Sequence, residues 1–225
     1  MTASRTTVDL ERAPTGSTAP ERATGVGGVP RLRVGVVVGS TRPGRLGESV
    51  AQWVYDIALR RPDAEFELID LRTYELPFLD EPLPPSVGQH TKAHTRAWAE
   101  KIASLDAFVF VTPEYNHGTS AVLKNALDFL YAEWNNKAAG FVSYGSSGGV
   151  RAVEQLRLVM GELQVADVRA QVALSLFTDF EGFRSLRPDP SKEKALGTLL
   201  DQLIAWGSAL RALRNPVGTL AATAT

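Results

Sequence analysis

The segment from Arg33 to Trp53 joins an apolar strand to a helix through a loop suited to an anion. Val34 to Val38 is a short, β-branched and almost wholly apolar run, which is typical of a strand buried on both faces of a parallel sheet. From Val50 onward the apolar positions follow helical spacing. Residues 39–49, which lie between the two, hold three glycines, two arginines and three hydroxyl side chains. This order of strand, glycine-rich loop and helix limits the fold more than any other feature of the chain.

We interpret the loop as a phosphate-binding loop. Free backbone N–H groups and the positive end of a helix dipole favour an anion there, and Ser40, Thr41 and Arg42 add side-chain donors. No Gly-Lys-Ser/Thr sequence closes the loop, and its glycines are not spaced G-x-G-x-x-G, so it is neither the triphosphate-binding loop nor the dinucleotide fingerprint. An ordinary strand-to-helix turn with a surface arginine is the alternative.

Charge and composition exclude several classes of function. With 24 basic and 25 acidic side chains, the chain does not favour nucleic acid as a partner, and the same balance argues against a strongly acidic electron carrier. The chain contains no cysteine, which excludes disulfides, thiolate nucleophiles, cysteine-ligated zinc and iron–sulfur clusters. No apolar run approaches the roughly 20 residues of a membrane-spanning helix. We therefore expect a cytoplasmic protein without a membrane partner.

The chain is expected to form one domain with a tail at each end. Residues 1–30 carry three prolines and a glycine-rich run without periodicity, which predicts a disordered N-terminal tail. Residues 31–213 form the expected domain, and 214–225 the expected flexible C-terminal tail. Residues 175–189 look irregular, and 76–85 form a proline-rich connection.

Five predicted strands alternate with five predicted helices, which indicates an α/β fold with right-handed crossovers and helices on both faces of a parallel sheet. A doubly wound five-stranded sheet takes the order 2-1-3-4-5, and its ligand crevice lies at the carboxyl ends of strands 1 and 3. The predicted strands are Val34–Val38, Glu65–Asp70, Ala107–Val111, Ala138–Ser143 and Val168–Leu174. The first predicted helix begins at Val50. The other four are His90–Leu105, Ser120–Leu130, Val150–Leu163 and Lys192–Leu213.

Three loop motifs resemble those of the NAD(P)H-dependent FMN reductase family. After the third strand the chain is similar to P-E-Y-N-x-x-x-P-x-x-L-K-N-A-x-D, with Ser120 in place of the family's proline, where serine suits a helix N-cap. Tyr144 to Ala152 resembles Y-G-x-x-G-G-x-R-A. The first loop is compared with G-S-x-R-x-x-S-x-N-x-x-L-A, from which it departs by Arg45 for serine and Gly47 for asparagine. The resemblance covers residues 31–213 and implies a flavodoxin-like fold.

The resemblance also implies a set of FMN-binding residues and a hydride donor, NADPH or NADH. For the phosphate these are Ser40, Arg42, Arg45, Gly47, Glu48 and Ser49. Around the ring and ribityl chain they are Pro113, Glu114, Tyr115 and Asn116. In the third loop they are Tyr144, Gly145, Ser146, Gly148 and Gly149, whose backbone would approach the ring closely and stabilise negative charge on it. Hydride transfer needs no side-chain acid or base, so no catalytic residue is named.

Plainer interpretations stand beside these assignments. Tyr115 and Tyr144 also suit the edge of a core, and Trp134 suits either a core or a shield over flavin across a dimer contact. Lys124 and Asp128 have the spacing of a solvated ion pair on a helix. His90 and His94 have the spacing of a metal pair, but no third ligand is evident, so no metal is expected.

The resemblance implies an enzyme whose bound FMN takes hydride from NADPH or NADH and reduces a small-molecule acceptor. Free flavin, a quinone, an azo compound and a metal or metalloid ion remain open as acceptors, as does the choice between NADPH and NADH. A flavodoxin-like FMN carrier that serves protein partners is the alternative, and a flavin-free interaction module is a third. Related proteins pair the third and fourth helices, which predicts a homodimer or homotetramer.

Overall fold

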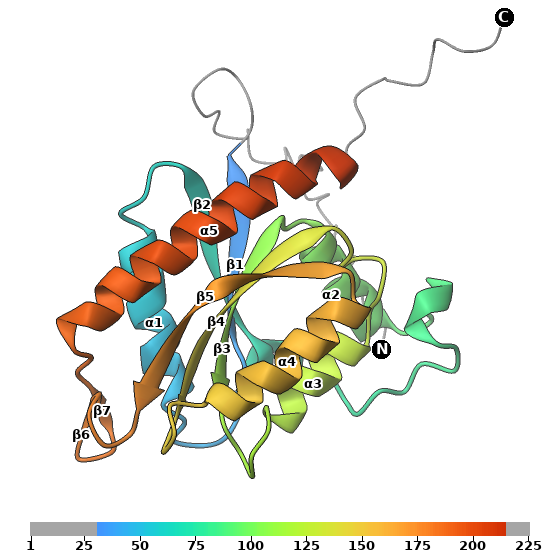
Figure 1. Cartoon of the computed structure of the whole chain (residues 1–225). Helices are drawn as coiled ribbons and strands as arrows, with labels where there is room; N and C mark the ends of the chain where they lie inside the picture. The colour runs from blue at the N-terminus through green and yellow to red at the C-terminus, as the bar shows by residue number, and fades with distance from the viewer. Residues whose placement is uncertain (1–30, 215–225) are drawn as a thin grey trace, which may run out of the picture. The chain divides into compact units, whose positions relative to one another are not determined.

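The computed structural model describes residues 31–214 (Figure 1). The predicted tails at 1–30 and 215–225 lie outside the described residues. Arg214, where the C-terminal tail was expected to begin, is still helical and is the last residue of α5 (Pro190–Arg214).

A single parallel sheet of five strands organises the described domain. Its strands follow the order β2-β1-β3-β4-β5, which confirms the order expected from the sequence. The order reverses next to β1, whose two neighbours are β2 and β3. The carboxyl ends of the strands therefore meet at one edge, at the bottom of Figure 1. The strands are β1 (Leu32–Val38), β2 (Ala64–Asp70), β3 (Ala107–Pro113), β4 (Lys137–Gly145) and β5 (Val165–Ser175).

Helices cover both faces of the sheet and build two separate apolar cores. Because successive strand residues point to opposite faces, Val36 belongs to the core under α1 and α5, whereas Val37 belongs to the core under the other three helices. Val54 and Leu200 fill the first core from α1 and α5. The remaining helices are α1 (Gly47–Ala58), α2 (Ala93–Ala103), α3 (Ala121–Asp128) and α4 (Val150–Glu162).

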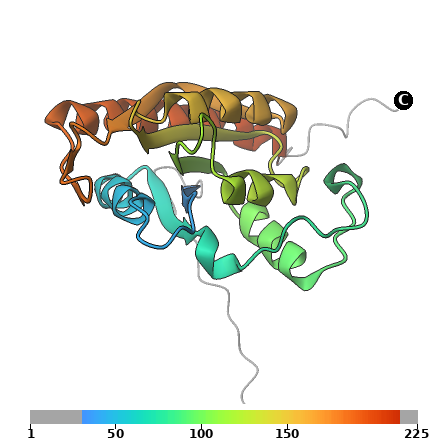
Figure 2. The same cartoon turned by 90° about the horizontal axis from the view of Figure 1, so that it is seen from below.

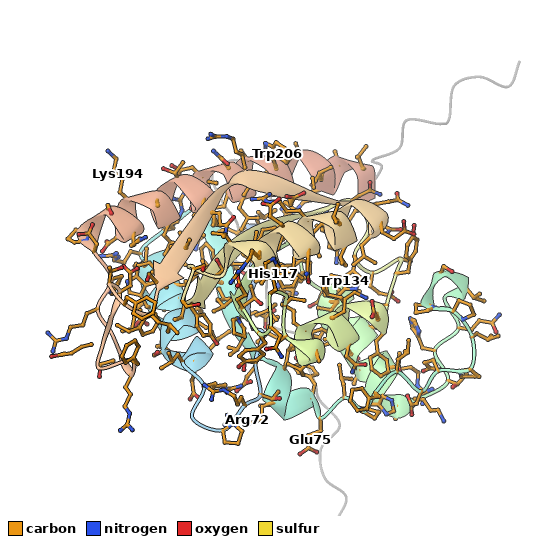
Figure 3. The ribbon with its side chains drawn as sticks, turned by 60° about the horizontal axis from the view of Figure 1, so that its bottom comes forward. Arg72, Glu75, His117, Trp134, Lys194 and Trp206 are labelled. Atoms are coloured by element: carbon orange, nitrogen blue, oxygen red, sulfur yellow. The ribbon has the colours of Figure 1, made fainter. Side chains whose placement is uncertain are left out.

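Trp134 lies in the second core, and its core interpretation is confirmed (Figure 3). Its side chain is fully buried, with its ring 5.0 Å from Phe108 and 6.2 Å from Trp98. Its indole N–H donates to the carbonyl of Leu127 at 3.2 Å. A side chain packed in this way has no free face with which to shield a flavin across a dimer contact.

The structure corrects two predictions at places where a carboxylate organises the backbone locally. The helix expected from His90 begins at Ala93, since Glu81 accepts hydrogen bonds from the backbone N–H groups of Thr91 and Lys92 just ahead of it. The segment 175–189, expected to be irregular, contains an antiparallel hairpin, β6 (Phe180–Glu181) and β7 (Ser185–Leu186). The buried carboxylate of Asp179 accepts from the N–H groups of Ser175 and Asp189 and closes the base of that hairpin.

None of the described helices is long and apolar enough to cross a membrane. Within residues 31–214, no group of three or more histidine, cysteine or acidic side chains is placed to hold a metal ion.

The amino-terminal edge of the sheet buries a lysine. Lys137 begins β4, is 3% exposed, and donates from Nζ to the carbonyl of Ile102 at 2.6 Å. Burial lowers the pKa of this lysine from 10.5 to about 7; Arg214 lowers it further, while Asp106 and Glu133 oppose the shift. Burial thus favours the neutral amine of this lysine in the folded chain.

This burial predicts that the free energy of unfolding increases with pH from 7 to 9. In that range the unfolded chain keeps Lys137 protonated while the folded chain releases the proton, so the unfolded state binds more protons. The slope is at most about 1.4 kcal/mol per pH unit. Lys137→Met should remove this rise, as measured by urea unfolding at pH 7, 8 and 9.

The matched control is Lys101→Met, because the Lys101 ammonium pairs with Glu67 at 2.9 Å on a partly exposed side chain. It should keep the parent's slope. An unchanged slope in Lys137→Met would show that the buried ammonium does not control this pH dependence.

Candidate functional site

The loops that follow β1, β3 and β4 gather at the carboxyl edge of the sheet, which Figure 2 views directly. A pocket of about 530 Å³ opens beside the first two of these loops, which is within the usual size of a small-molecule site. No carboxylate contributes to its lining. The lining residues are Ser40, Thr41, Arg42, Leu76, Pro77, Phe78, Tyr115, Ser120, Ala121, Val122 and Asn125.

The first loop is fastened to the end of β2 by Arg45. The side chain of Arg45 is 1% exposed, and its guanidinium makes two parallel bonds to the Asp70 carboxylate, at 2.8 and 2.5 Å. It also donates to the carbonyl of Ser40 and contacts Glu48 at 3.3 Å. The hydrogen bonds that the guanidinium donates to Asp70 raise the pKa of Arg45, and burial opposes this shift. Arg45 thus neutralises Asp70 at the end of β2 and Glu48 in its own loop, and it does not line the pocket.

Arg42 is placed differently from Arg45. It is exposed, it lines the pocket, and it makes no ion pair with any residue in the described part of the chain. At the start of α1, no side chain caps the helix, because Leu46 occupies the N-cap position. The Ser49 hydroxyl donates backwards to the carbonyl of Leu46 at 2.8 Å. This end of the loop therefore presents a cation and an uncapped helix N-terminus.

The second loop turns back on itself directly after β3. The N–H groups of Tyr115 and Gly118 each donate to the other residue's carbonyl, at 2.9 and 3.0 Å. Asn116 and His117 have φ values of 48° and 72°, as a type I′ turn requires. The Tyr115 hydroxyl lies 2.9 Å from the Ser40 hydroxyl, so this turn contacts the first loop. Pro113, which closes β3, is buried beneath it.

Ser120 links the second loop to the first. Its hydroxyl caps α3 by accepting from the N–H of Leu123 at 3.2 Å, and it donates to the carbonyl of Gly39. The N-cap role expected for this serine is confirmed. A proline at this position would supply neither bond.

The third loop is braced by an ion pair between Glu114 and Arg151. The Glu114 side chain is 5% exposed, and its carboxylate accepts from the backbone N–H of Arg151 at 3.1 Å and from Nε at 2.6 Å. Burial raises the pKa of Glu114, but the hydrogen bonds from Arg151 outweigh it and hold the pKa below its usual value. Glu114 thus joins the end of β3 to the start of α4.

Glycine is required at two positions of the third loop. Gly148 and Gly149 have φ values of +70° and +73°, and a Cβ on Gly149 would lie 2.8 Å from the backbone nitrogen of Tyr144. Gly145 is buried at the end of β4, and Ser146 is exposed. Gly148 and Gly149 are buried as well, and their missing side chains leave room for Ala173, Ser143 and Tyr144, so these glycines serve the packing of the loop against the sheet.

Tyr144 lies beneath the first turn of α1. A Cβ on Gly47 would come within 2.7 Å of its hydroxyl oxygen, which is buried without a hydrogen-bond partner in the described structure. Burial raises the pKa of Tyr144 above its usual range, so this hydroxyl stays protonated at neutral pH. The ring also lies 6.4 Å from that of Phe180 on the hairpin. Tyr144 is thus a support for α1 at the edge of the core.

Sequence reasoning missed three parts of the site. Asp70 ends β2, at the same sheet edge as the predicted loops, and that position was the available signal. The pocket wall at 76–78 belongs to a segment described only as a proline-rich connection. Asn125 is part of the quoted motif, but nothing in the sequence showed that its amide bonds to Pro77 and Leu79.

The histidines and the charged pair on α3 have plain roles. His90 contacts Glu133 at 2.7 Å, and His94 contacts Asp80 at 2.9 Å, so the two rings bond to different carboxylates. Lys124 and Asp128 form an exposed ion pair at 2.7 Å. Chemically, the site offers a cation beside an uncapped helix N-terminus and an apolar wall.

Comparison with known proteins identifies the family. The sequence pattern of the NADPH-dependent FMN reductases matches residues 32–179. A protein of Schizosaccharomyces pombe named NAD(P)H-dependent FMN reductase is 44% identical over 146 residues, covering 64% of this chain and 73% of that protein. A probable NADPH:quinone oxidoreductase of Oryza sativa is 31% identical over 155 residues, covering 64% of this chain and 67% of that protein.

Solved structures show the same fold. The flavoenzyme NAD(P)H:(acceptor) oxidoreductase FerB of Paracoccus denitrificans superposes with a TM-score of 0.61 at 20% identity, covering 79% of this chain and 98% of that one. At this identity the likeness concerns the fold alone. From the family match over residues 32–179, the chain belongs to the NADPH-dependent FMN reductase family.

Proposed function

We propose that this NAD(P)H-dependent FMN oxidoreductase binds its cofactor at the carboxyl edge of the sheet and reduces small-molecule acceptors of the quinone or free-flavin type. Bound FMN supplies the hydride acceptor and the electron donor. With a quinone as acceptor, NADPH, a proton and the quinone give NADP⁺ and the hydroquinone. A cytoplasmic location, where nicotinamide cofactors are supplied, is part of the proposal.

The single observation that carries the proposal is Arg42 at the uncapped N-terminus of α1, beside the pocket. A dianionic phosphate there would accept hydrogen bonds from the Arg42 guanidinium, the Ser40 hydroxyl and the N–H groups at the start of α1. Tyr115 and Asn116 offer a turn against which the ribityl chain and ring can lie. The third loop lies at the same edge, and N–H groups of its exposed residues Ser146 and Ser147 can face negative charge on the ring.

The first test is the visible spectrum of the purified protein before and after anaerobic NADPH. The proposal expects a flavin spectrum that bleaches within the mixing time of the assay. A flavin spectrum that persists would favour the electron carrier, and a colourless protein that binds no added FMN would favour the flavin-free module.

The second test separates the two arginines of the first loop. A charge-assisted hydrogen bond to phosphate is worth roughly 1.5 to 3 kcal/mol, so Arg42→Ala should weaken FMN binding about 10- to 150-fold. The melting temperature of the flavin-free protein should change little. Arg45→Ala should instead lower that melting temperature, because it leaves Asp70 without its guanidinium partner. Apoprotein titration by flavin fluorescence and thermal melting give the two readouts.

Arg60→Ala is the matched control, since Arg60 lies on the same side of the sheet and pairs with Glu193 at the surface. It should alter neither quantity. If Arg42→Ala binds FMN as tightly as the parent does, the phosphate does not lie beside this guanidinium.

We also propose a homodimer or homotetramer formed through α3 and α4. On α4, the side chain of Leu158 is 79% exposed and that of Val150 is 40% exposed, which is costly for a face that stays in water. A second copy of this chain would cover both.

Light scattering at micromolar concentration should give a mass at least twice the 24.3 kDa of one chain. Leu158→Asp should shift this mass toward the monomer, whereas Leu59→Asp, at an exposed leucine beside α1 on the other face of the sheet, should not. A parent protein that elutes and scatters as a monomer rules the assembly out.

A further inference from the structure

Asn125 on α3 holds the pocket wall formed by residues 76–78, which lies far from it in the sequence. Its Nδ2 donates to the carbonyl of Pro77 at 2.7 Å, and its Oδ1 accepts from the N–H of Leu79 at 3.0 Å. The amide therefore reproduces, with one side chain, the pair of bonds that a neighbouring strand would make. Both bonds fall on the residues that flank Phe78, 46 to 48 positions earlier in the chain.

Phe78 is left with a fixed backbone and a free side chain. It lines the pocket and is nevertheless 86% exposed, the highest value among the large apolar side chains of the described domain. Neither an aromatic ring contact nor a core position involves Phe78 in the described structure. Two side-chain hydrogen bonds from Asn125 thus fix the backbone on either side of an aromatic ring that is exposed at the pocket.

The lining of the pocket has two chemically distinct parts. Ser40, Thr41 and Arg42 form the polar part, and Leu76, Pro77, Phe78 and Val122 of α3 form the apolar part. A flat aromatic molecule gains from contact with a ring face, whereas a hydrated metal or metalloid ion does not. The lining therefore discriminates between acceptors by shape and not by charge alone.

We propose that Phe78 is the residue that selects planar aromatic acceptors, such as quinones, and that Asn125 is the positioning residue that holds it there. The inference rests on the proposed function, which it narrows to one class of acceptor. It needs no contact between Asn125 and the acceptor.

Steady-state kinetics of the holoenzyme test the selection. Phe78→Ala should raise the KM for 1,4-naphthoquinone roughly 2- to 12-fold, the worth of one aromatic contact, with kcat unchanged. The KM for ferricyanide, a compact metal complex, should stay at the parent value. Phe78→Tyr should restore the parent KM for naphthoquinone. Phe177→Ala removes another exposed aromatic, between β5 and β6, and is the control.

A double-mutant cycle tests the positioning. Asn125→Ala should raise the same KM by a similar factor, and Asn125→Ala combined with Phe78→Ala should be no worse than Phe78→Ala alone, because one residue acts through the other. Asn135→Ala is the matched control, since the Asn135 amide makes side-chain bonds to the carbonyls of Tyr131 and Leu163. If Asn125→Ala does not fold, Asn125→Asp, which keeps an acceptor for Leu79, takes its place.

Equilibrium dialysis of naphthalene-2-sulfonate, a planar and redox-inert probe, supplies a readout that does not depend on turnover. Phe78→Ala should weaken its binding by the same factor as it raises the KM for naphthoquinone. The dialysis still measures the contribution of Phe78 to binding if the protein fails to oxidise NADPH. Failure of the proposed function is therefore recognised separately from failure of this inference. Three results would overturn the inference. The first is that the effects of Asn125→Ala and Phe78→Ala on the KM for naphthoquinone add up in the double variant. The others are that Phe78→Ala raises the KM for ferricyanide, or weakens FMN binding, by the same factor.

Discussion

Burial of the central strands on both faces is the constraint on which the rest of the structure depends. β3 and β4 are buried along their whole length, and β1 is buried at all but one position. Such strands admit few polar side chains, and the buried Lys137 and Thr112 lie at or next to strand ends. Most hydroxyls and charges of the chain therefore collect where the strands end. Because the strands are parallel, those ends lie at one edge. A site at that edge follows from how the core is made.

The same logic separates what the sequence predicts from what it does not. Apolar runs and helical spacing predict the strands, the sheet order and the loops that meet, since these depend on local pattern and on chain handedness. The partner of Arg45 could not be predicted, because Asp70 comes beside it only through the pairing of β1 with β2. The Asn125 bonds to Pro77 and Leu79 likewise depend on how a long connection folds back over α3. The contacts that could not be predicted are those in which a side chain bonds to a residue far away in the sequence.

Charge in the site is arranged by pairing. Asp70 and Glu114 are the carboxylates that end β2 and follow β3, and each is held by an arginine, Arg45 or Arg151. Burial alone would raise the pKa of either acid, and the arginines reverse this, so both acids stay ionised and neutralised. Arg42, which lines the pocket, takes part in none of the described ion pairs. An anionic ligand meets one cation and no free carboxylate among the pocket residues.

The contact between Gly47 and Tyr144 has a consequence for variation at this site. The tyrosine hydroxyl occupies the space that any side chain at position 47 would need, so a residue with a Cβ there requires the tyrosine ring to move. The family pattern has asparagine at position 47 and tyrosine at position 144, which is possible only with the ring placed elsewhere. Glycine at position 47 therefore lets the Tyr144 ring lie closer to the start of α1 than the family's asparagine would allow.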